Sequence, residues 1–291
     1  MHRLATLCLA AALTTPYALA TTRNVPSQYS TVQAAVNAAA SGDTILIAAG
    51  TYNEQVTISS SKSNLIIEGS SRSGSIVSSG ANQITVLNQG TGITFENLTL
   101  RNTSTANTNT NHVLRNFGAK CIVKNANIDG WEDTLYSGSN TQMYVSNCLV
   151  QGAVDFVYGN GRIFLTGCTI EQMRASPTGG TIAAPNTDAS QNYGIVFSSC
   201  TVTSAAGVPA GSTWLGRPWG ANGECAFINC TIGSCIGAAG WIEFQGTTNS
   251  KTARIAEYVC PSGRVSWDQR LTSTQAAQYT KSNVLGGWNP N

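Results

Sequence analysis

A six-residue pattern that returns six times is the feature that most restricts how this chain can fold. Its first, fourth and sixth positions are mostly apolar or small, and its third position is Asn in four of the six copies. The copies begin at positions 95, 123, 145, 165, 197 and 227, so they recur at similar but unequal intervals. One strand signature per unit, with turns of variable length between units, is typical of a parallel β-helix. The alternative, a leucine-rich repeat, lacks its consensus and its helix here.

The two ends of the predicted solenoid read differently from its middle. Apolar residues from Val32 to Ala39 recur at helical spacing and Gly42 ends the pattern, which predicts a short helix. Such a helix can cap the open end of a β-helix. Short strands are expected before the explicit repeat, at 44–47, 50–58, 65–69 and 84–87. Residues 273–279 are predicted to be helical, in a C-terminal tail that packs on the outside of the β-helix.

The N-terminal segment, from Met1 to Ala20, has the pattern of a secretory signal peptide. Positive charge in residues 1–3 precedes an apolar run over 4–13, and Ala18-Leu19-Ala20 offers a cleavage site. The run is too short to span a bilayer, and no other stretch approaches transmembrane length. A buried first helix is the alternative reading. We therefore expect cleavage after about Ala20, a secreted, extracellular protein, and a single domain over residues 21–291.

The charge of the mature chain argues against acidic macromolecular partners. Loss of Arg3 would leave 15 basic residues against 14 acidic ones, and no basic block is present. We expect neither nucleic acid nor a membrane surface as a partner. The abundance of Ser, Thr, Asn and Gly suits strands, tight turns and a neutral, hydroxyl-rich partner such as a polysaccharide.

The cysteines permit two interpretations. Nine are present, and eight remain if Cys8 leaves with the signal peptide, so disulfides are possible in an oxidising compartment. The fourth position of the repeat, however, is a slot for small apolar residues. It holds Cys148, Cys168, Cys200 and Cys230. Composition leaves open whether each is a free buried thiol or part of a bridge.

Two neighbouring repeats each lead to an aspartate. Residues 122–130 and 144–152 are nearly copies, and Asp133 and Asp155 lie eight positions after the repeat residues Asn125 and Asn147. Equivalent positions of a β-helix stack at the ~4.8 Å spacing of neighbouring strands. Two carboxylates so close cannot both ionise cheaply, so one is expected to hold a proton near neutral pH. The pair is our candidate for an acid and a nucleophile.

Other kinds of catalytic site are poorly represented. A Gly-x-Ser-x-Gly elbow, a Cys-x-x-Cys pair and a Gly-rich phosphate loop are absent from the sequence. We interpret His112, the one histidine of the mature chain, as a surface or strand-end residue. Arg217 would hold one of the two carboxylates ionised, and Trp219 and Tyr136 offer flat faces for sugars. A structural ion pair for Arg217 and a core position for Trp219 are the alternatives.

Several motifs together resemble those of the pectin methylesterases, over essentially the whole mature chain. The matching segments are Gly50-Thr51-Tyr52-Asn53-Glu54, Asp133-Thr134-Leu135-Tyr136, Gly152-Ala153-Val154-Asp155-Phe156-Val157-Tyr158-Gly159, Leu215-Gly216-Arg217-Pro218-Trp219, Gly240-Trp241 and Leu285-Gly286-Gly287. The resemblance implies an all-β, right-handed parallel β-helix. It also implies a carbohydrate esterase that removes methyl esters from the galacturonate units of pectin.

The resemblance assigns roles to individual residues. Asp155 corresponds to the nucleophile, Asp133 to the general acid and base, and Arg217 to the residue that orients the nucleophile. The positions that line the sugar-binding cleft in the family are Tyr136, Tyr158, Trp219 and Trp241. In family members, a disulfide joins two turns of the β-helix at the positions that Cys168 and Cys200 occupy here. The resemblance implies no cofactor or metal, methyl-esterified homogalacturonan as the partner, and a monomer.

Two positions depart from the family pattern. Two glutamine amides usually stabilise the oxyanion; one is Glu132 here, and the other aligns with Thr110. An ionised Glu132 would repel the oxyanion, so we expect it to work protonated and activity to favour acidic pH. Thr110, Asn111 or a neighbouring amide would have to supply the second donor. Losing one such donor typically costs about 10²–10³-fold in rate.

The altered oxyanion positions also favour an alternative, a catalytically impaired homologue that binds pectin without turnover. The intact Asp133, Asp155 and Arg217 speak against it. A pectin-cleaving hydrolase or lyase of the same shape is a third possibility. The sequence lacks the Asp-Asp pair and the Gly-His-Gly motif that such hydrolases have, and it lacks the calcium-binding cluster of acidic residues that lyases need. Of three Asn-x-Ser/Thr sequons, we expect only Asn102 to be an accessible glycosylation site.

Overall fold

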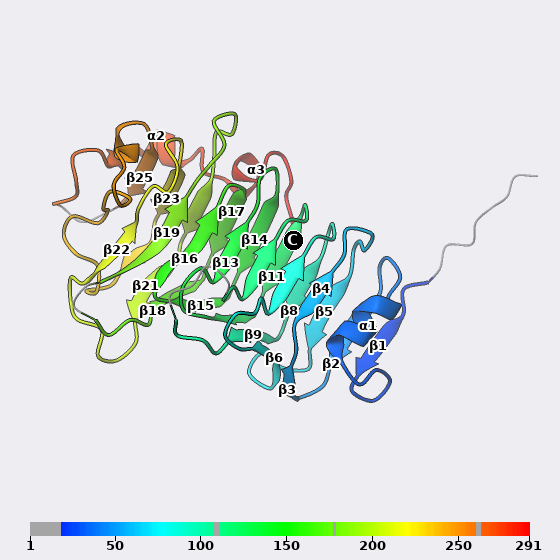
Figure 1. Ribbon diagram of the computed structural model, residues 1–291. Helices are drawn as coiled ribbons and strands as arrows, with labels where there is room; N and C mark the ends of the chain where they lie inside the picture. The colour runs from blue at the N-terminus through cyan, green and yellow to red at the C-terminus, as the bar shows by residue number, and fades with distance from the viewer. Residues whose placement is uncertain (1–18, 107–110, 177–178, 260–262) are drawn as a thin grey trace, which may run out of the picture.

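The predicted parallel β-helix is confirmed. The computed structural model describes residues 19–106, 111–176, 179–259 and 263–291, and all paired strands in these ranges run parallel. The chain winds right-handed through three sheets, and successive turns stack along the long axis of the molecule (Figure 1). Each sheet is crossed once per turn, so residues of one sheet that are adjacent in space are a full turn apart in sequence.

Within the described ranges, the three sheets contain 11, eight and seven strands. The 11-stranded sheet consists of β1 (Thr22–Val25), β2 (Thr44–Ile47), β5 (Ile66–Gly69), β8 (Thr94–Glu96), β11 (Cys121–Lys124), β14 (Gln142–Ser146), β17 (Arg162–Thr166), β20 (Ile195–Ser198), β23 (Glu224–Ile228), β25 (Arg254–Tyr258) and β26 (Gln269–Arg270). The eight-stranded sheet consists of β3 (Gly50–Asn53), β6 (Ser75–Ser79), β9 (Thr99–Asn102), β12 (Asn127–Asp129), β15 (Leu149–Gly152), β18 (Thr169–Gln172), β21 (Thr201–Ser204) and β24 (Thr231–Ile232). The seven-stranded sheet consists of β4 (Val56–Ile58), β7 (Val86–Asn88), β10 (Leu114–Asn116), β13 (Leu135–Ser137), β16 (Val154–Gly159), β19 (Gly180–Pro185) and β22 (Thr213–Gly216).

The repeat is the corner between the 11-stranded and the eight-stranded sheet. Its third residue is in the left-handed backbone region in every copy, with φ between 50° and 60°. The residues concerned are Asn97, Asn125, Asn147, Gly167, Ser199 and Asn229. Glycine adopts this region freely, and asparagine tolerates it better than most residues. The preference for Asn at this position is therefore a requirement of the turn.

The inward positions of the repeat form the core. The rings of Phe197 and Phe227 stack with centroids 4.2 Å apart, and the sixth-position residues, such as Ile128 and Val150, are fully buried. The fourth-position cysteines point inward as the pattern predicted. Cys168 and Cys200 are both free thiols among the described cysteines, so the predicted bridge between them is not formed in this structure. The repeat predicts that these two cysteines are neighbours, but it carries no information on whether they are oxidised to a disulfide.

A short helix caps the N-terminal end, as predicted. Helix α1 (Val32–Ala38) buries Val32, Ala35 and Val36 against the first rung. Thr31 is its N-cap and accepts a hydrogen bond from the Ala34 amide. The expected signal segment, residues 1–20, lies almost entirely outside the described residues. Within the described ranges, no helix is long and apolar enough to cross a membrane.

The C-terminal tail packs on the outside of the 11-stranded sheet, which confirms the prediction. It follows a short 3₁₀ helix, η1 (Asn249–Lys251), and contains α2 (Ser273–Ala276) and α3 (Lys281–Val284). Val284 and Leu285 are fully buried in a second apolar cluster with Tyr144 and Phe164 of the sheet. The single helix expected over 273–279 is shorter: α2 ends at Ala276, and a separate helix, α3, begins after its N-cap Thr280.

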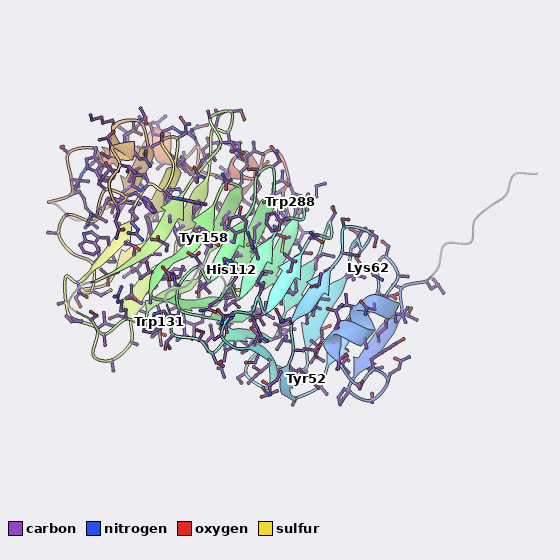
Figure 2. The ribbon with its side chains drawn as sticks, viewed as in Figure 1. Tyr52, Lys62, His112, Trp131, Tyr158 and Trp288 are labelled. Carbon is purple, nitrogen blue, oxygen red and sulfur yellow. The ribbon has the colours of Figure 1, made fainter. Side chains whose placement is uncertain are left out.

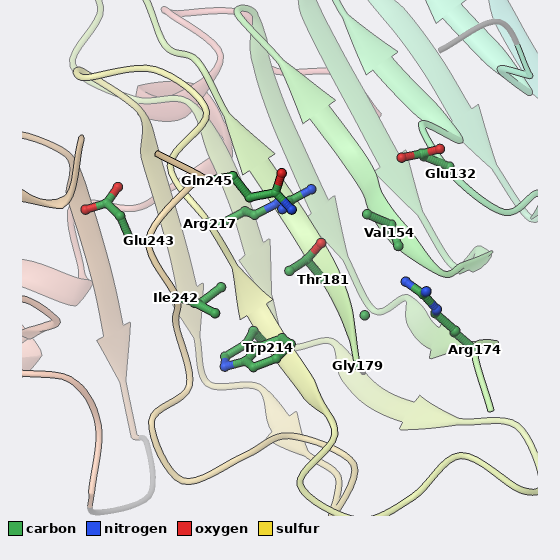
Figure 3. A pocket seen from close by; sticks show the side chains of 11 residues that line it. Glu132, Val154, Arg174, Gly179, Thr181, Trp214, Arg217, Ile242, Glu243 and Gln245 are labelled. Carbon is green, nitrogen blue, oxygen red and sulfur yellow. The ribbon is translucent and has the colours of Figure 1, made fainter. Parts of the chain in front are cut away.

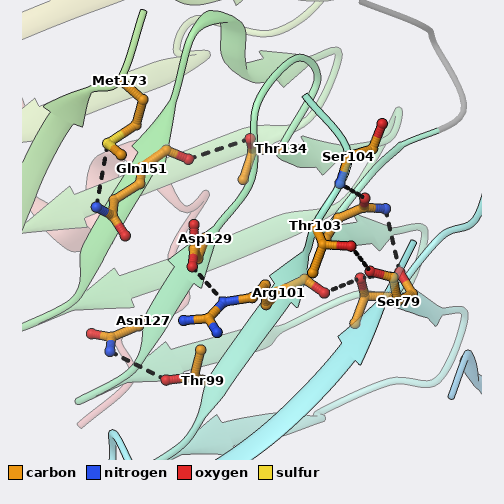
Figure 4. A network of polar contacts seen from close by, with 12 residues as sticks. Ser79, Thr99, Arg101, Thr103, Ser104, Asn127, Asp129, Thr134, Gln151 and Met173 are labelled. Atoms are coloured by element: carbon orange, nitrogen blue, oxygen red, sulfur yellow. Dashed lines mark hydrogen bonds and ion pairs between the residues drawn. The ribbon is translucent and has the colours of Figure 1, made fainter. Parts of the chain in front are cut away.

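Polar contacts link residues on neighbouring strands of the eight-stranded sheet (Figure 4). Arg101 pairs with Asp129 on the next strand at 2.6 Å. The prediction of an accessible glycan site at Asn102 is wrong, because its side chain is buried and donates to the Gln83 carbonyl at 2.9 Å. Asn229, which we expected to be inaccessible in a strand, is exposed in a corner turn.

Candidate active site

The register of the seven-stranded sheet brings Asp133 and Asp155 to equivalent places on adjacent turns. Leu135 pairs with Val157, and Tyr136 pairs with Tyr158; the same sequence offset separates the two aspartates. The Asp133 amide donates to the Val154 carbonyl at 3.2 Å. The stacking predicted from the repeat spacing is thus present in the structure.

Both aspartates have an unusual backbone conformation. Asp133 has φ 56° and Asp155 has φ 49°, in the left-handed region that is rare for residues other than glycine. Asp155 also lies at a register shift, because Val154 pairs with Thr181 whereas Val157 pairs with Ala183. One extra residue on β16 forms a bulge that bends the strand and aims a side chain outward from the ladder. Conformations of this kind often occur at functional sites.

Asp155 is held by two donors from later turns. The Arg217 guanidinium contacts both of its carboxylate oxygens, with Nη2 2.7 Å from Oδ2 and Nε 3.0 Å from Oδ1. Thr181, on β19, donates its hydroxyl to Oδ1 and accepts the Asp155 backbone N–H at 3.1 Å. Asp155 is only 7% exposed, so these contacts are shielded from water. They fix the orientation of the carboxylate and place a positive charge beside it.

The surroundings of Asp133 act differently on its carboxyl group. Burial raises its pKa to about 7, and the neighbouring charges of Asp155 and Glu132 act in the same direction. A hydrogen bond from Tyr158 and the charge of Arg217 oppose this shift but do not cancel it. The site therefore places a carboxyl group held by a guanidinium beside a second carboxyl group whose pKa is raised to about 7.

Glu132 lies beside the pair and is partly buried. Burial and the charge of Asp155 raise its pKa above the ordinary value, while Arg217 and Arg174 act against the shift. The direction agrees with our expectation of a protonated Glu132. Thr110 lies outside the described residues. Asn111 is engaged elsewhere, because its amide donates to Ser104 and to the Ala106 carbonyl.

Aromatic rings extend from the aspartates along the sheet. The Tyr136 and Tyr158 rings lie 4.8 Å apart, and Trp219 lies 6.0 Å from Tyr158. Trp219 is 39% exposed, so its predicted place at a surface cleft fits the structure better than the core position. Phe244, which we did not predict, lines the same cavity, and its ring lies 4.8 Å from the Arg217 guanidinium.

Two predicted positions differ in the structure. Trp241 is 1% exposed, packs edge-on against Phe227, and donates its indole N–H to Glu257 at 2.9 Å. The prediction that Trp241 lines the cleft is therefore wrong. His112 is buried rather than at the surface, with Nδ1 3.0 Å from the Tyr158 hydroxyl and 2.9 Å from the Asp133 carbonyl (Figure 2). It supports the rings and the backbone of the site.

Two cavities meet beside the aspartates, at Glu132 and Arg217. The smaller, about 260 Å³, is lined by Asp133, Asp155, Tyr158, Trp219 and Phe244 among others. The larger, about 500 Å³, extends towards Trp214 and Glu243 (Figure 3). Glu132 and Arg217 line both, so the two form one groove across the sheet. In the part of the chain that the structure describes, no three His, Cys, Asp or Glu side chains are grouped to hold a metal ion.

The geometry of the site is consistent with an ester hydrolase, and comparisons with known proteins point the same way. The family model described as Pectinesterase matches residues 19–288. Pectinesterase 2 of Citrus sinensis is 31% identical over 92% of this chain and 57% of its own length. The pectinesterase of Daucus carota is 30% identical over 89% of this chain and 90% of its own length.

The solved structures agree. Pectin methylesterase from carrot has a TM-score of 0.85 and 27% identity over 94% of this chain and 95% of that chain. Pectin methylesterase PemA from Erwinia chrysanthemi has a TM-score of 0.81 and 25% identity, over 95% of this chain and 99% of that chain. This chain spans about half the length of several of its plant relatives, among them pectinesterase/pectinesterase inhibitor 3 of Arabidopsis thaliana, of which it covers 48%.

Proposed function

This chain belongs to the pectinesterase family, and we propose that it hydrolyses the methyl esters of galacturonate units in pectin. The observation that carries the proposal is the different surroundings of two neighbouring carboxyls. Arg217 and Thr181 hold Asp155 as an oriented carboxylate, while burial keeps a proton on Asp133. A nucleophile and an acid on adjacent turns are what acyl transfer from an ester requires.

In the proposed reaction, an Asp155 oxygen attacks the carbonyl carbon of the methyl ester. The carbonyl oxygen becomes an oxyanion as the new C–O bond forms. When this intermediate collapses, the bond to the methoxy group breaks, and Asp133 donates its proton so that methanol leaves. The product is an acyl-enzyme and an ionised Asp133. Asp133 then takes a proton from water, which attacks the acyl carbonyl and releases Asp155 as a carboxylate. The freed galacturonic acid loses its proton to solvent.

Arg217 and the aromatic rings support these steps without changing covalently. Arg217 keeps the charge of Asp155 in place before attack and after release. The rings of Tyr136, Tyr158 and Trp219 provide flat faces along the groove for sugar units. Binding the polymer there would place one ester over Asp155 and turn a bimolecular reaction into an oriented one.

Glu132 would stabilise the oxyanion as a protonated donor. Its raised pKa supports this role, since an ionised Glu132 would repel the developing charge. Activity should fall as pH rises, because Glu132 and Asp133 both act protonated, and above pH 7 the acid form of Asp133 falls about tenfold per pH unit. Glu132→Gln supplies an amide donor at every pH. The part of the fall in activity that comes from ionisation of Glu132, on the acidic side of the profile, should therefore be absent from this variant.

The pH dependence is measured as kcat/KM for methanol release, in the parent chain and in Glu132→Gln. A flat or alkaline-peaked profile of the parent chain would contradict the protonated Glu132. A Glu132→Gln profile with the same shape on the acidic side as that of the parent chain would also contradict it. The fall in activity near pH 7 that comes from ionisation of Asp133 should be present in both proteins, so it serves as the internal reference.

A second candidate function is binding of pectin without turnover, and Glu132 in a position where the family has glutamine favours it. Methanol release from highly methylated pectin between pH 4 and pH 9 separates the two. Release supports the esterase, whereas retained pectin binding with no release at any pH would establish the binder.

We also propose that the chain acts as a secreted, extracellular monomer after cleavage near Ala20. N-terminal sequencing and sedimentation of the exported protein test this.

A further inference from the structure

Arg217 lies directly after β22, which is the end strand of the seven-stranded sheet within the described ranges. The outer edge of β22 is covered by residues 236–242, here called the edge segment, which bridge to it at two places. Gly216, the residue before Arg217, bridges to Trp241, and its carbonyl accepts the Ile242 N–H at 3.2 Å. The backbone that presents Arg217 therefore depends on how the edge segment is held.

Trp241 holds the edge segment from inside the β-helix. A Cβ atom added at Gly216 would lie 3.1 Å from Cζ3 of the indole, so the ring packs directly on the backbone beside Arg217. The indole N–H donates to Oε1 of Glu257, on β25, at 2.9 Å. Three residues after Trp241, the Phe244 ring lies 4.8 Å from the Arg217 guanidinium. This stretch of chain thus supports Arg217 both at its backbone and at its side chain.

Glu257 is the charged group at the centre of this arrangement. It is 1% exposed, and Arg264 binds both of its oxygens, with Nε 2.8 Å from Oε1 and Nη2 3.1 Å from Oε2. Arg264 Nη1 also donates to two carbonyls of the edge segment, those of Gly237 and Ala238, at 3.2 Å and 3.3 Å. The buried ion pair therefore holds the edge segment at two points, through the guanidinium near its start and through the indole near its end.

Stability alone does not require a buried ion pair at this end of the β-helix. Removing two charges from water costs free energy that their attraction often does not offset, and apolar side chains of similar volume are often as stable. A carboxylate adds direction, because it accepts from the indole and from the guanidinium fork at defined angles. Neither Glu257 nor Trp241 lines the two cavities beside the aspartates, so an effect of these residues on catalysis would pass through Arg217.

We propose that Glu257 is a positioning residue for the proposed reaction. Its carboxylate fixes the Trp241 indole, and the indole fixes the backbone at Gly216. That backbone in turn sets where the Arg217 guanidinium meets Asp155. The inference rests on the proposed function and adds to it a residue that lies outside the groove.

The test measures methanol release in Glu257→Gln, which removes the charge that binds Arg264 and keeps nearly the same shape. We expect kcat to fall about tenfold, the effect of one charged hydrogen bond, and KM to change by less than about twofold because the groove is untouched. Trp241→Phe keeps a ring against Gly216 but cannot donate to Glu257, so it should lose a similar factor in kcat.

Asp43→Asn is the matched control at the other end of the β-helix. Asp43 is also fully buried, and it pairs with Arg23 at 2.7 Å, so the same exchange of carboxylate for amide is made far from Arg217. Asp43→Asn should lower the midpoint of thermal unfolding, as Glu257→Gln should, but leave kcat unchanged. Equal losses of kcat in the two variants would show a general effect of stability and would contradict the inference.

A double-mutant cycle shows whether Glu257 acts through Arg217. Arg217→Lys has no planar fork for Asp155, so adding Glu257→Gln to it should lower kcat by less than about twofold. A further loss as large as in the parent chain overturns the inference, and so does an unchanged kcat in folded Glu257→Gln. If Glu257→Gln does not fold, Trp241→Phe decides by the same cycle.

If the parent chain releases no methanol, the proposed function fails, and NMR of the Arg217 Nε–H group then tests the inference separately. This group donates to Asp155, and its signal is the one that Arg217→Lys removes. A signal that shifts in Glu257→Gln and in Trp241→Phe, but not in Asp43→Asn, supports the positioning role. A signal that stays as in the parent chain in all three variants overturns it.

Discussion

Two sets of residues in this β-helix share the left-handed backbone conformation, at different corners of the coil. The corner between the 11-stranded and eight-stranded sheets uses it in every repeat, and its asparagines, such as Asn125 and Asn147, are exposed and neutral. Near the seven-stranded sheet, Asp133 and Asp155 adopt the same conformation beside charged groups, Asp155 buried and Asp133 partly buried. The first set turns the chain; the second aims reactive groups.

The difference between the two corners lies in what surrounds the left-handed residue. At the repeat corner, the next residue, such as Ala126 or Cys148, is buried in the core. At Asp155, a bulge leaves the backbone N–H outside the ladder, and Thr181 accepts it. Arg217 then compensates the carboxylate charge. A fold that repeats one strained conformation can thus supply a catalytic geometry when a later turn provides partners for it.

The largest expected effect comes from exchanging the polar groups of the two corners. Asp155→Asn keeps a residue that tolerates the left-handed region but removes the nucleophile, so methanol release should fall by about 10⁴-fold or more. Asn147→Asp makes the reverse change at the repeat corner and should leave activity intact. The two variants are compared by kcat and by cooperative thermal unfolding. Equal losses in both would contradict the division between the corners.

The next effect concerns the support of the bulge. Thr181→Val is close in shape but removes both the donor to Asp155 Oδ1 and the acceptor of its N–H. We expect kcat to fall about 10- to 100-fold with little change in KM, because a charged hydrogen bond is lost and a buried donor is left unpaired. Thr181→Ser keeps the hydroxyl and should restore most of the rate. A loss in KM alone, or no rescue by serine, would argue against a positioning role.

The smallest effect should appear in stability and not in catalysis. Asn147→Val places a β-branched side chain at φ 52° and should lower the free energy of unfolding by about 1–2 kcal/mol. Asn147→Gly should be nearly neutral, because glycine adopts this conformation freely. Denaturant unfolding measures both variants, and kcat below the transition should match the parent chain. Equal stability of the Val and Gly variants would show that the turn does not demand this conformation.

The repeat made part of the site predictable from the sequence. Asn125 and Asn147 are as far apart in the sequence as Asp133 and Asp155, so the stacking of the two aspartates could be read directly. Thr181 follows a long connection with no repeat signature, and its register to Asp155 depends on a bulge that leaves no local pattern.

Other differences have similar physical causes. Trp241 and Phe244 come after the last repeat, where no periodicity fixes which side chain points inward; the structure buries the first and exposes the second to the cavity. The burial of His112 and Asn102 goes with partners on other turns, Tyr158 and Gln83, whose contacts cannot be counted along the chain. Residue spacing therefore predicts which residues share a rung, whereas the rotation of individual side chains depends on packing.

The protonation of the two aspartates tests the central claim most directly. Carbon-13 NMR of protein labelled at aspartate carboxyls, recorded from pH 4 to pH 9, follows each group without substrate. One carboxyl should titrate near pH 7 because burial and Asp155 raise the pKa of Asp133, and that signal should be missing from Asp133→Asn. If the signal that Asp133→Asn removes titrates below pH 5, Asp133 is ionised at neutral pH, and the division into acid and nucleophile is wrong.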